Sequence, residues 1–162
     1  MKSILLTLAL LGVAIPLIAN DDWPQLLGNA RHSGNAPHAT LGDDLGLIAA
    51  IPLTDGVFAS PIVVDGKVYV IDGAGVVFAL DGDSLRVLWK FATRGGPGNC
   101  NNVAAPVVLG KYLHVGTTAG YYYVLDRNTG AVVKEIDCRE PIFAAPVANQ
   151  QRAYFATLGA RV

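Results

Sequence analysis

The stretch SPIVVDGKVYVIDGAGVVFALD, residues 60–81, is followed by a second version of itself, APVVLGKYLHVGTTAGYYYVLD, at residues 105–126. Both copies begin with a small residue and a proline, Pro61 or Pro106, and a third proline in the same context follows at Pro146. The three prolines are 45 and then 40 residues apart. A chain that repeats itself at this interval is built from successive copies of one structural unit.

Each copy contains short apolar runs interrupted by glycine, aspartate and asparagine, which is typical of antiparallel strands joined by tight turns. The runs of the first copy predict strands over residues 68–71, 76–80 and 87–91. Gly75 and Gly120 stand fourteen residues after their prolines, where a hairpin needs a residue that tolerates positive φ. No segment after residue 20 has a helical period, so the sequence predicts an all-β fold.

A repeat of roughly 40 to 50 residues with four short strands is typical of a β-propeller blade, a small twisted antiparallel sheet. We expect two complete blades at about residues 58–93 and 103–138, a partial blade at 143–162, and one outer strand at 45–53. Since a closed ring needs roughly four to eight blades, residues 45–162 are expected to form an incomplete propeller. Its exposed blade edges predict self-association.

The end of each copy carries a recognisable motif. ALDGDSLRVLW, residues 79–89, and VLDRNTGAVVK, residues 124–134, resemble the Ala-x-Asp-x-x-Thr-Gly-x-x-x-Trp signature of pyrroloquinoline-quinone-type (PQQ-like) β-propeller repeats. The first copy has Leu85 in place of the glycine, and the second has Lys134 in place of the tryptophan. DWPQLLGNARHSG, residues 22–34, is similar to the Trp-Pro-Gln segment ahead of the first blade in many secreted members. The structural motif residues are Gly75, Asp81, Trp89, Gly120, Asp126 and Gly130.

The resemblance implies that these motif residues are mainly structural. Trp89 is expected to pack flat against the neighbouring blade and to bury roughly 150 to 250 Å², while the aspartate and glycine form the tight turn. The alternative is that Trp89 forms the floor for a stacked quinone, but aromatic residues at strand spacing usually belong to a core. Strand alternation also places Tyr122 on the opposite face from Tyr121 and Tyr123.

The first twenty residues form a separate segment. An apolar run at residues 4–18 follows a basic residue and precedes the polar residues NDD, which is typical of a secretory signal peptide. A retained membrane anchor is the alternative, but the run contains Pro16 and is shorter than the roughly 20 apolar residues of a spanning helix. We expect cleavage near Ala19 or Asn20, a leading segment at 21–44, and a periplasmic or secreted protein without a transmembrane anchor.

The composition describes a packed domain and excludes some classes of partner. The 162 residues include 12 basic and 13 acidic side chains, with a net charge of −1 and 52% hydrophobic residues. The basic residues are scattered singly, whereas a nucleic-acid-binding protein would gather them in a patch or stripe. No nucleic-acid partner is therefore expected.

The sequence contains parts of known binding motifs, but these motifs are incomplete. Residues 81–83, DGD, begin like a calcium loop but lack its later acidic ligands, so a turn is expected. Residues 95–100, GGPGNC, match neither a P-loop nor a dinucleotide fingerprint, and are expected to form a loop between blades. His32, His38 and His114 are not spaced as metal ligands. The sequence therefore predicts no catalytic residue and no metal site, and it assigns no cofactor-binding residue.

The two cysteines, Cys100 and Cys138, lie in successive connections between blades, which gather on one rim of a propeller. An exported protein meets an oxidising compartment, where a bridge between them would stabilise the fold by about 4 kcal/mol. The alternative is a pair of unpaired thiols.

The family resemblance implies two possible classes of function. The favoured hypothesis is a non-catalytic scaffold that binds another protein, in the manner of the outer-membrane assembly factor that shares the fold. The alternative is a fragment of a periplasmic quinoprotein dehydrogenase, which would use PQQ and calcium. In that subfamily the alcohol dehydrogenases carry adjacent cysteines and a carboxylate and amide cluster on calcium, a pattern not visible in this sequence.

Overall fold

The computed structural model describes residues 22–37, 46–47 and 49–162. The predicted signal peptide and His38 lie outside these described residues. Within them the regular structure consists of β-strands and one short 3₁₀ turn, Gly96–Gly98, which confirms the predicted all-β fold. No helix in the described ranges is long and apolar enough to cross a membrane.

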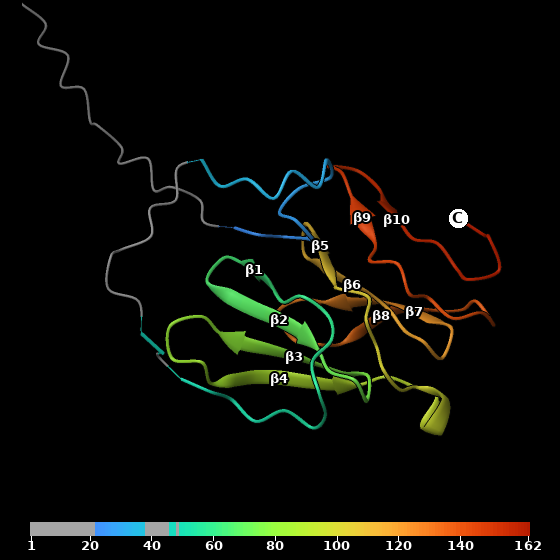
Figure 1. Cartoon of the computed structure of the whole chain (residues 1–162), viewed down its shortest axis with the longest axis horizontal. Helices are drawn as coiled ribbons and strands as arrows, with labels where there is room; N and C mark the ends of the chain where they lie inside the picture. Colours follow the sequence, from blue (N-terminus) through green and yellow to red (C-terminus); the bar gives the residue numbers. More distant parts are fainter. Residues whose placement is uncertain (1–21, 38–45, 48) are drawn as a thin grey trace, which may run out of the picture.

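The strands form two antiparallel four-stranded sheets and one two-stranded sheet (Figure 1). The first sheet contains β1 (Ile62–Val64), β2 (Lys67–Ile71), β3 (Val76–Asp81) and β4 (Val87–Ala92) in that order. The second contains β5 (Val107–Leu109), β6 (Tyr112–Gly116), β7 (Tyr121–Asp126) and β8 (Val132–Asp137). The third pairs β9 (Val147–Ala148) with β10 (Ala153–Tyr154).

The sequence repeat is also a repeat of strand register. Val68 pairs with Leu80 in the first sheet, and Leu113 pairs with Leu125 in the second, forty-five residues further on. Both sheets also have a register shift at the same place, between Ala79 and Leu80 and between Val124 and Leu125. Such irregularities increase the local twist of the strand pair. The two sheets are therefore copies of one unit.

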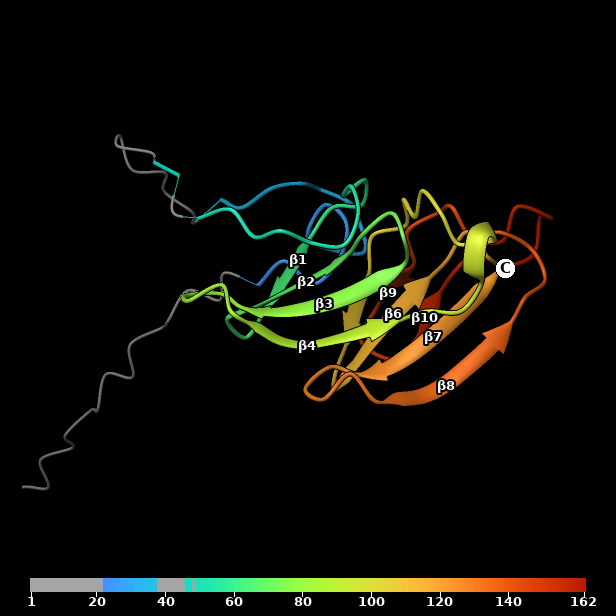
Figure 2. The same cartoon turned by 90° about the horizontal axis from the view of Figure 1, so that it is seen from below.

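The main hydrophobic core lies between the first and second sheets, which Figure 2 shows as neighbouring layers. Because side chains alternate along a strand, each sheet contributes one set of alternating residues. Fully buried members of this core are Tyr69, Ile71, Val77, Ala79, Leu113, Val115, Tyr123 and Leu125. Burying each of the larger side chains contributes about 1.5 to 3 kcal/mol, so this interface is the main support of the fold.

The strand expected over residues 45–53 is not formed at its described residues. Leu53 instead packs against the outer side of the first sheet, beside Phe78 and Leu80. The next two backbone N–H groups, of Thr54 and Asp55, donate to a side chain rather than to a neighbouring strand. The expected strand is therefore wrong for the described residues, of which only Ile51 and Leu53 are partly buried and Leu47 is 87% exposed.

Candidate functional site

One face of the molecule carries turns and connections from both four-stranded sheets. The β2–β3 turn, residues 72–75, and the connection 93–106 after β4 lie at the same end of their sheet. The β6–β7 turn, residues 117–120, and the connection 138–146 after β8 occupy the equivalent end of the second sheet. We call this the turn face.

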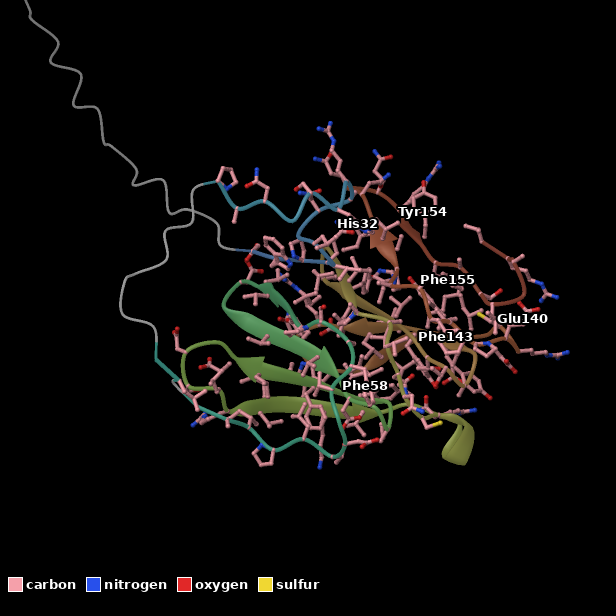
Figure 3. All side chains as sticks on the ribbon, viewed as in Figure 1. His32, Phe58, Glu140, Phe143, Tyr154 and Phe155 are labelled. Carbon is pink, nitrogen blue, oxygen red and sulfur yellow. The ribbon has the colours of Figure 1, made fainter. Side chains whose placement is uncertain are left out.

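Three apolar side chains are exposed on the turn face, at equivalent positions of the repeat. Phe58, Val103 and Phe143 are 58%, 40% and 47% exposed. Each is the third residue before the proline that opens a repeat. Figure 3 labels Phe58 near the ends of β2 and β4, and Phe143 farther to the right, in the connection that follows β8.

Backbone contacts tie this apolar set to the two turns. The Phe58 ring covers Gly73, where a Cβ atom would lie 3.0 Å from Phe58 Cε2. Asn102, next to Val103, donates its backbone N–H to the same Gly73 carbonyl at 3.3 Å. Ile142, next to Phe143, donates its N–H to Thr117 O at 3.0 Å. The three side chains therefore belong to segments that contact the two turns, on one surface.

Buried amides hold the surface rigid from below. Asn102 is 1% exposed, and its Nδ2 donates to Gly73 O and to Asn99 Oδ1, both at 3.1 Å. Its Oδ1 accepts from Thr118 N–H at 3.0 Å. Asn99 Nδ2 in turn donates to Thr93 Oγ1 at 2.7 Å. Because a buried amide with all its partners positions them closely, Asn102 fixes one turn relative to the other.

Asp72 is the buried acid of the turn face, and both of its carboxylate oxygens accept hydrogen bonds from the protein. Oδ2 accepts from Thr54 N–H at 3.1 Å, from Asp55 N–H at 3.2 Å and from the Thr54 hydroxyl. Oδ1 accepts from Val76 N–H at 2.9 Å. These four hydrogen bonds join Asp72 to residues 54–55 and to the start of β3. Among the described residues, no three His, Cys, Asp or Glu side chains are grouped to hold a metal ion.

Four of the motif residues, Asp81, Trp89, Asp126 and Gly130, lie toward the opposite face, whereas Gly75 and Gly120 lie in the two turns of the turn face. The Trp89 indole donates to Arg127 O at 3.0 Å, and Tyr69 Oη donates to the same oxygen at 3.2 Å. The ring of Trp89 lies against Gly130, where a Cβ atom would be 2.7 Å from Trp89 Cε3. Arg127 also pairs with the Asp65 carboxylate. The structure thus places Trp89 as a contact between sheets.

The remaining motif residues form turns. Asp81 accepts from the Ser84 hydroxyl at 2.6 Å and from Ser84 N–H at 2.8 Å, and these bonds lower the pKa of Asp81. Asp126 accepts from the backbone N–H groups of Thr129 and Asn128, which lower the pKa of that carboxyl. Residues 81–83 therefore form a turn. Gly75, Gly120 and Gly130 all have positive φ, at 78°, 86° and 74°.

His114 lies inside the second sheet, on the side that faces the two-stranded sheet. His114 Nδ1 is 3.1 Å from Tyr122 Oη. Tyr122 stacks on Phe155 with ring centroids 3.8 Å apart, whereas Tyr121 and Tyr123 lie on the other side, as alternation predicts. Burial lowers the pKa of His114 and raises that of Tyr122. His32 is exposed in the leading segment.

Both cysteines border the β6–β7 turn. The Thr118 hydroxyl donates to Cys100 O at 2.7 Å, and Cys138 N–H donates to Gly120 O at 2.8 Å. The two side chains are separate thiols, one exposed and one half-buried. A bridge between them stays a prediction.

Sequence reasoning missed the apolar set of the turn face. Exposed residues in connections have no strand periodicity, so Phe58, Val103 and Phe143 gave no signal of their own. Their constant place three residues before a repeated proline is the signal that could have identified them.

Comparison with known proteins identifies the repeat. The family model described as outer membrane protein assembly factor BamB matches residues 48–157. Quinohemoprotein alcohol dehydrogenase ADH-IIG of Pseudomonas putida is 33% identical over 118 residues, covering 69% of this chain and 15% of the relative. The quinohemoprotein alcohol dehydrogenase of Comamonas testosteroni is 34% identical over 124 residues, covering 69% and 18%. The chain thus spans less than a fifth of the length of these curated relatives.

Solved structures show the same likeness in three dimensions. The Comamonas testosteroni enzyme superposes with a TM-score of 0.69 at 25% identity, over 82% of this chain and 22% of that chain. BamB from Moraxella catarrhalis superposes with a TM-score of 0.58 at 26% identity, over 66% and 36%. The four-stranded sheets are therefore β-propeller blades.

Proposed function

This chain belongs to the PQQ-like β-propeller repeat family, and on that premise we propose that it is a protein-binding propeller segment that acts through its turn face. The proposed partner is a protein of the cell envelope. The family description, which names an outer membrane protein assembly factor, supports this class of function over a purely structural one.

The observation that carries the proposal is the exposed apolar set Phe58, Val103 and Phe143. Exposed apolar side chains scattered singly are normal on a protein surface. Here three repeats place such a side chain at one equivalent position, above two turns that a buried amide holds together. Aromatic anchors on a rigid support are typical of the energetically important residues of protein interfaces.

The proposal also places the protein outside the cytoplasm. We propose that residues 1–20 are a signal peptide cleaved near Ala19 or Asn20. Mass spectrometry of the protein from its native cell would show a mature chain that begins near Asn20 or Asp21. A cytoplasmic product that retains Met1 would contradict this location.

Site-specific crosslinking tests the partner. A photoreactive residue at Phe58 or Phe143 should crosslink one envelope protein in the native cell. The matched control is the same photoreactive residue at Leu88 or Val133, which are 43% and 54% exposed on the outer strands β4 and β8.

Binding to the isolated partner gives a second measurement. Phe58→Ser together with Phe143→Ser should weaken binding by about a hundredfold, since each aromatic anchor is worth roughly 1 to 2 kcal/mol. Equal crosslinking at the turn face and the outer strands would contradict the proposal.

A second function is favoured by the curated relatives, both of which are quinohemoprotein alcohol dehydrogenases. In that case the chain would be part of a dehydrogenase that binds PQQ and calcium. Calcium takes six to eight oxygen ligands, and among the described residues no three His, Cys, Asp or Glu side chains are grouped to supply them. We expect no alcohol-dependent reduction of an artificial electron acceptor after incubation with PQQ and calcium. Sustained, PQQ-dependent reduction would establish the dehydrogenase function instead.

A further inference from the structure

The start of the described chain crosses the first strands of successive sheets. Trp23 forms an antiparallel bridge with Val63 in β1, donating its N–H to Val63 O at 2.6 Å and accepting from Val63 N–H at 3.1 Å. The next residue, Pro24, accepts from Val108 N–H in β5 at 2.8 Å. One residue therefore meets the first sheet, and its neighbour meets the second.

Gln25 continues the series to the third sheet, through its side chain. Its Oε1 accepts from Ala148 N–H in β9 at 3.0 Å, and its Nε2 donates to Ala148 O at 3.2 Å. The side-chain amide thus supplies the pair of bonds that a neighbouring strand would make. Gln25 is 5% exposed, so a side chain that could not make both bonds would leave buried backbone groups unpaired.

The three partner residues occupy one position of the repeat. Val63, Val108 and Ala148 each stand two residues after the proline that opens their copy. Each directs its backbone N–H away from its own sheet and toward the leading segment. The repeat therefore presents one equivalent donor per sheet, along a line that residues 23–25 follow.

Two further contacts hold this segment in place. The Asp22 carboxylate accepts from Asp65 N–H at 2.8 Å. Gly28, with φ at 82°, turns the chain back under the Trp23 ring, where a Cβ atom would lie 3.1 Å from two ring carbons. The segment is therefore anchored on both sides of its three contacts.

We infer that these repeated N–H groups form a binding site for a peptide segment, in which three consecutive residues each contact one repeat, and that residues 22–25 occupy this site in this chain. Recognition at strand edges draws affinity from main-chain hydrogen bonds and specificity from side chains. Gln25 is the specificity-determining residue, because it makes both bonds to the third sheet. The ligand class is a peptide that carries Trp-Pro-Gln and turns directly after the proline.

The full chain allows a direct test. A protease recognition sequence placed within residues 38–45 lets the folded protein be cut, which leaves residues 22–37 bound only by noncovalent contacts. We expect this piece to stay with the rest of the protein during gel filtration. A labelled synthetic peptide of residues 22–37 should then exchange into the cut protein, as measured by fluorescence anisotropy. The Gln25→Ala peptide should bind at least about tenfold more weakly, because two buried hydrogen bonds are lost. The Arg31→Ala peptide, changed at an exposed side chain, should bind like the original.

Two results would overturn the inference. One is release of the cut piece while the circular dichroism of the remaining protein stays unchanged. The other is equal binding of the Gln25→Ala and Arg31→Ala peptides. Hydrogen exchange on the uncut chain provides a separate measurement that needs no cutting. Gln25→Ala should speed exchange at Ala148 by about tenfold or more without changing β2 and β3. Unchanged exchange at Ala148 would also overturn it.

Discussion

At the scale of single residues, Leu85 and Gly130 show what the motif glycine is needed for. Both occupy the same repeat position, and both have positive φ, at 56° and 74°. A non-glycine residue in this conformation costs about 1 to 2 kcal/mol, which the first sheet tolerates at Leu85. Gly130 differs because the Trp89 ring lies against its Cα. The glycine is thus required by the tryptophan that docks on it, as well as by the turn.

The buried histidine predicts an acid-sensitive fold. His114 is 8% exposed, and its Nε2 has no hydrogen-bond partner among the described residues. Burial lowers its pKa, so the unfolded chain binds a proton at a higher pH than the folded chain does. The resulting stability is present above the ordinary histidine pKa of about 6.5 and declines as pH falls below it.

We therefore expect the urea midpoint of unfolding to be lower at about pH 5.5 than at about pH 7.5. His114→Gln should remove most of this difference, whereas His32→Gln, at an exposed position, should leave it unchanged. An equally steep pH dependence in the His114→Gln chain would show that another group is responsible.

At the scale of elements, the sequence predicted three of the four strands of the first sheet to within one residue at each end, and β1 was not among them. Alternation and turn glycines are local signals, and β2, β3 and β4 obey them. Residues 45–53 carried the same apolar signal, but their described part forms no strand. The N–H groups of Thr54 and Asp55 donate instead to the Asp72 carboxylate, which lies eighteen and seventeen residues later in the sequence. No local pattern reveals such a contact.

The candidate site was less predictable for a related reason. Exposed apolar residues in connections gave no periodicity, and the amide network of Asn99 and Asn102 joins groups from two sheets. Likewise, the segment around Gln25 was identified by family resemblance, but its contact with Ala148 spans 123 residues. Sequence patterns predict what each repeat forms by itself, whereas these contacts depend on how the repeats meet.

The contact between Trp89 of the first sheet and Gly130 of the second predicts how one substitution changes the stability of the fold. Gly130→Ala would place a Cβ atom 2.7 Å from Trp89 Cε3 and would also strain a backbone with φ at 74°. We expect a loss of about 2 to 4 kcal/mol in unfolding free energy, from backbone strain and overpacking together. Gly110→Ala is the matched control, because Gly110 has φ at 58° and no atom within 4 Å of the added carbon. It should cost only about 1 to 2 kcal/mol. Equal losses by denaturant unfolding would mean that Trp89 does not constrain Gly130.

At the scale of the whole molecule, the sheets lie in succession, and each offers a different surface. The turn face carries the apolar set, the opposite face carries the turns of Asp81 and Asp126, and the leading segment joins the first strands. Figures 1 and 2 show the succession of the sheets. The fourth strands, β4 and β8, lie at the outer edge of their sheets. A strand at a sheet edge has backbone groups free to pair with another chain, unless charge, bulges or twist prevent it.

The outer edges of this molecule are only partly protected. Val87, Leu88, Val132 and Val133 are 48%, 43%, 46% and 54% exposed at the starts of β4 and β8. Leu88 and Val133 are the extra residues at the two register shifts, so two exposed apolar side chains of each outer strand oppose one residue of its neighbour. The register shifts beside these positions add twist, which opposes edge pairing but does not cover the side chains.

We therefore predict that the mature chain self-associates through its outer strands. Light scattering should show an average mass that rises with protein concentration. Leu88→Lys together with Val133→Lys should lower the association constant at least about tenfold, because each change removes apolar contact and adds charge at an edge. The Phe58→Ser and Phe143→Ser chain is the control, since it changes an equal number of exposed apolar residues on the turn face. If that chain dissociates instead, the turn face is where the copies meet. A mass independent of concentration would show that twist alone protects the edges.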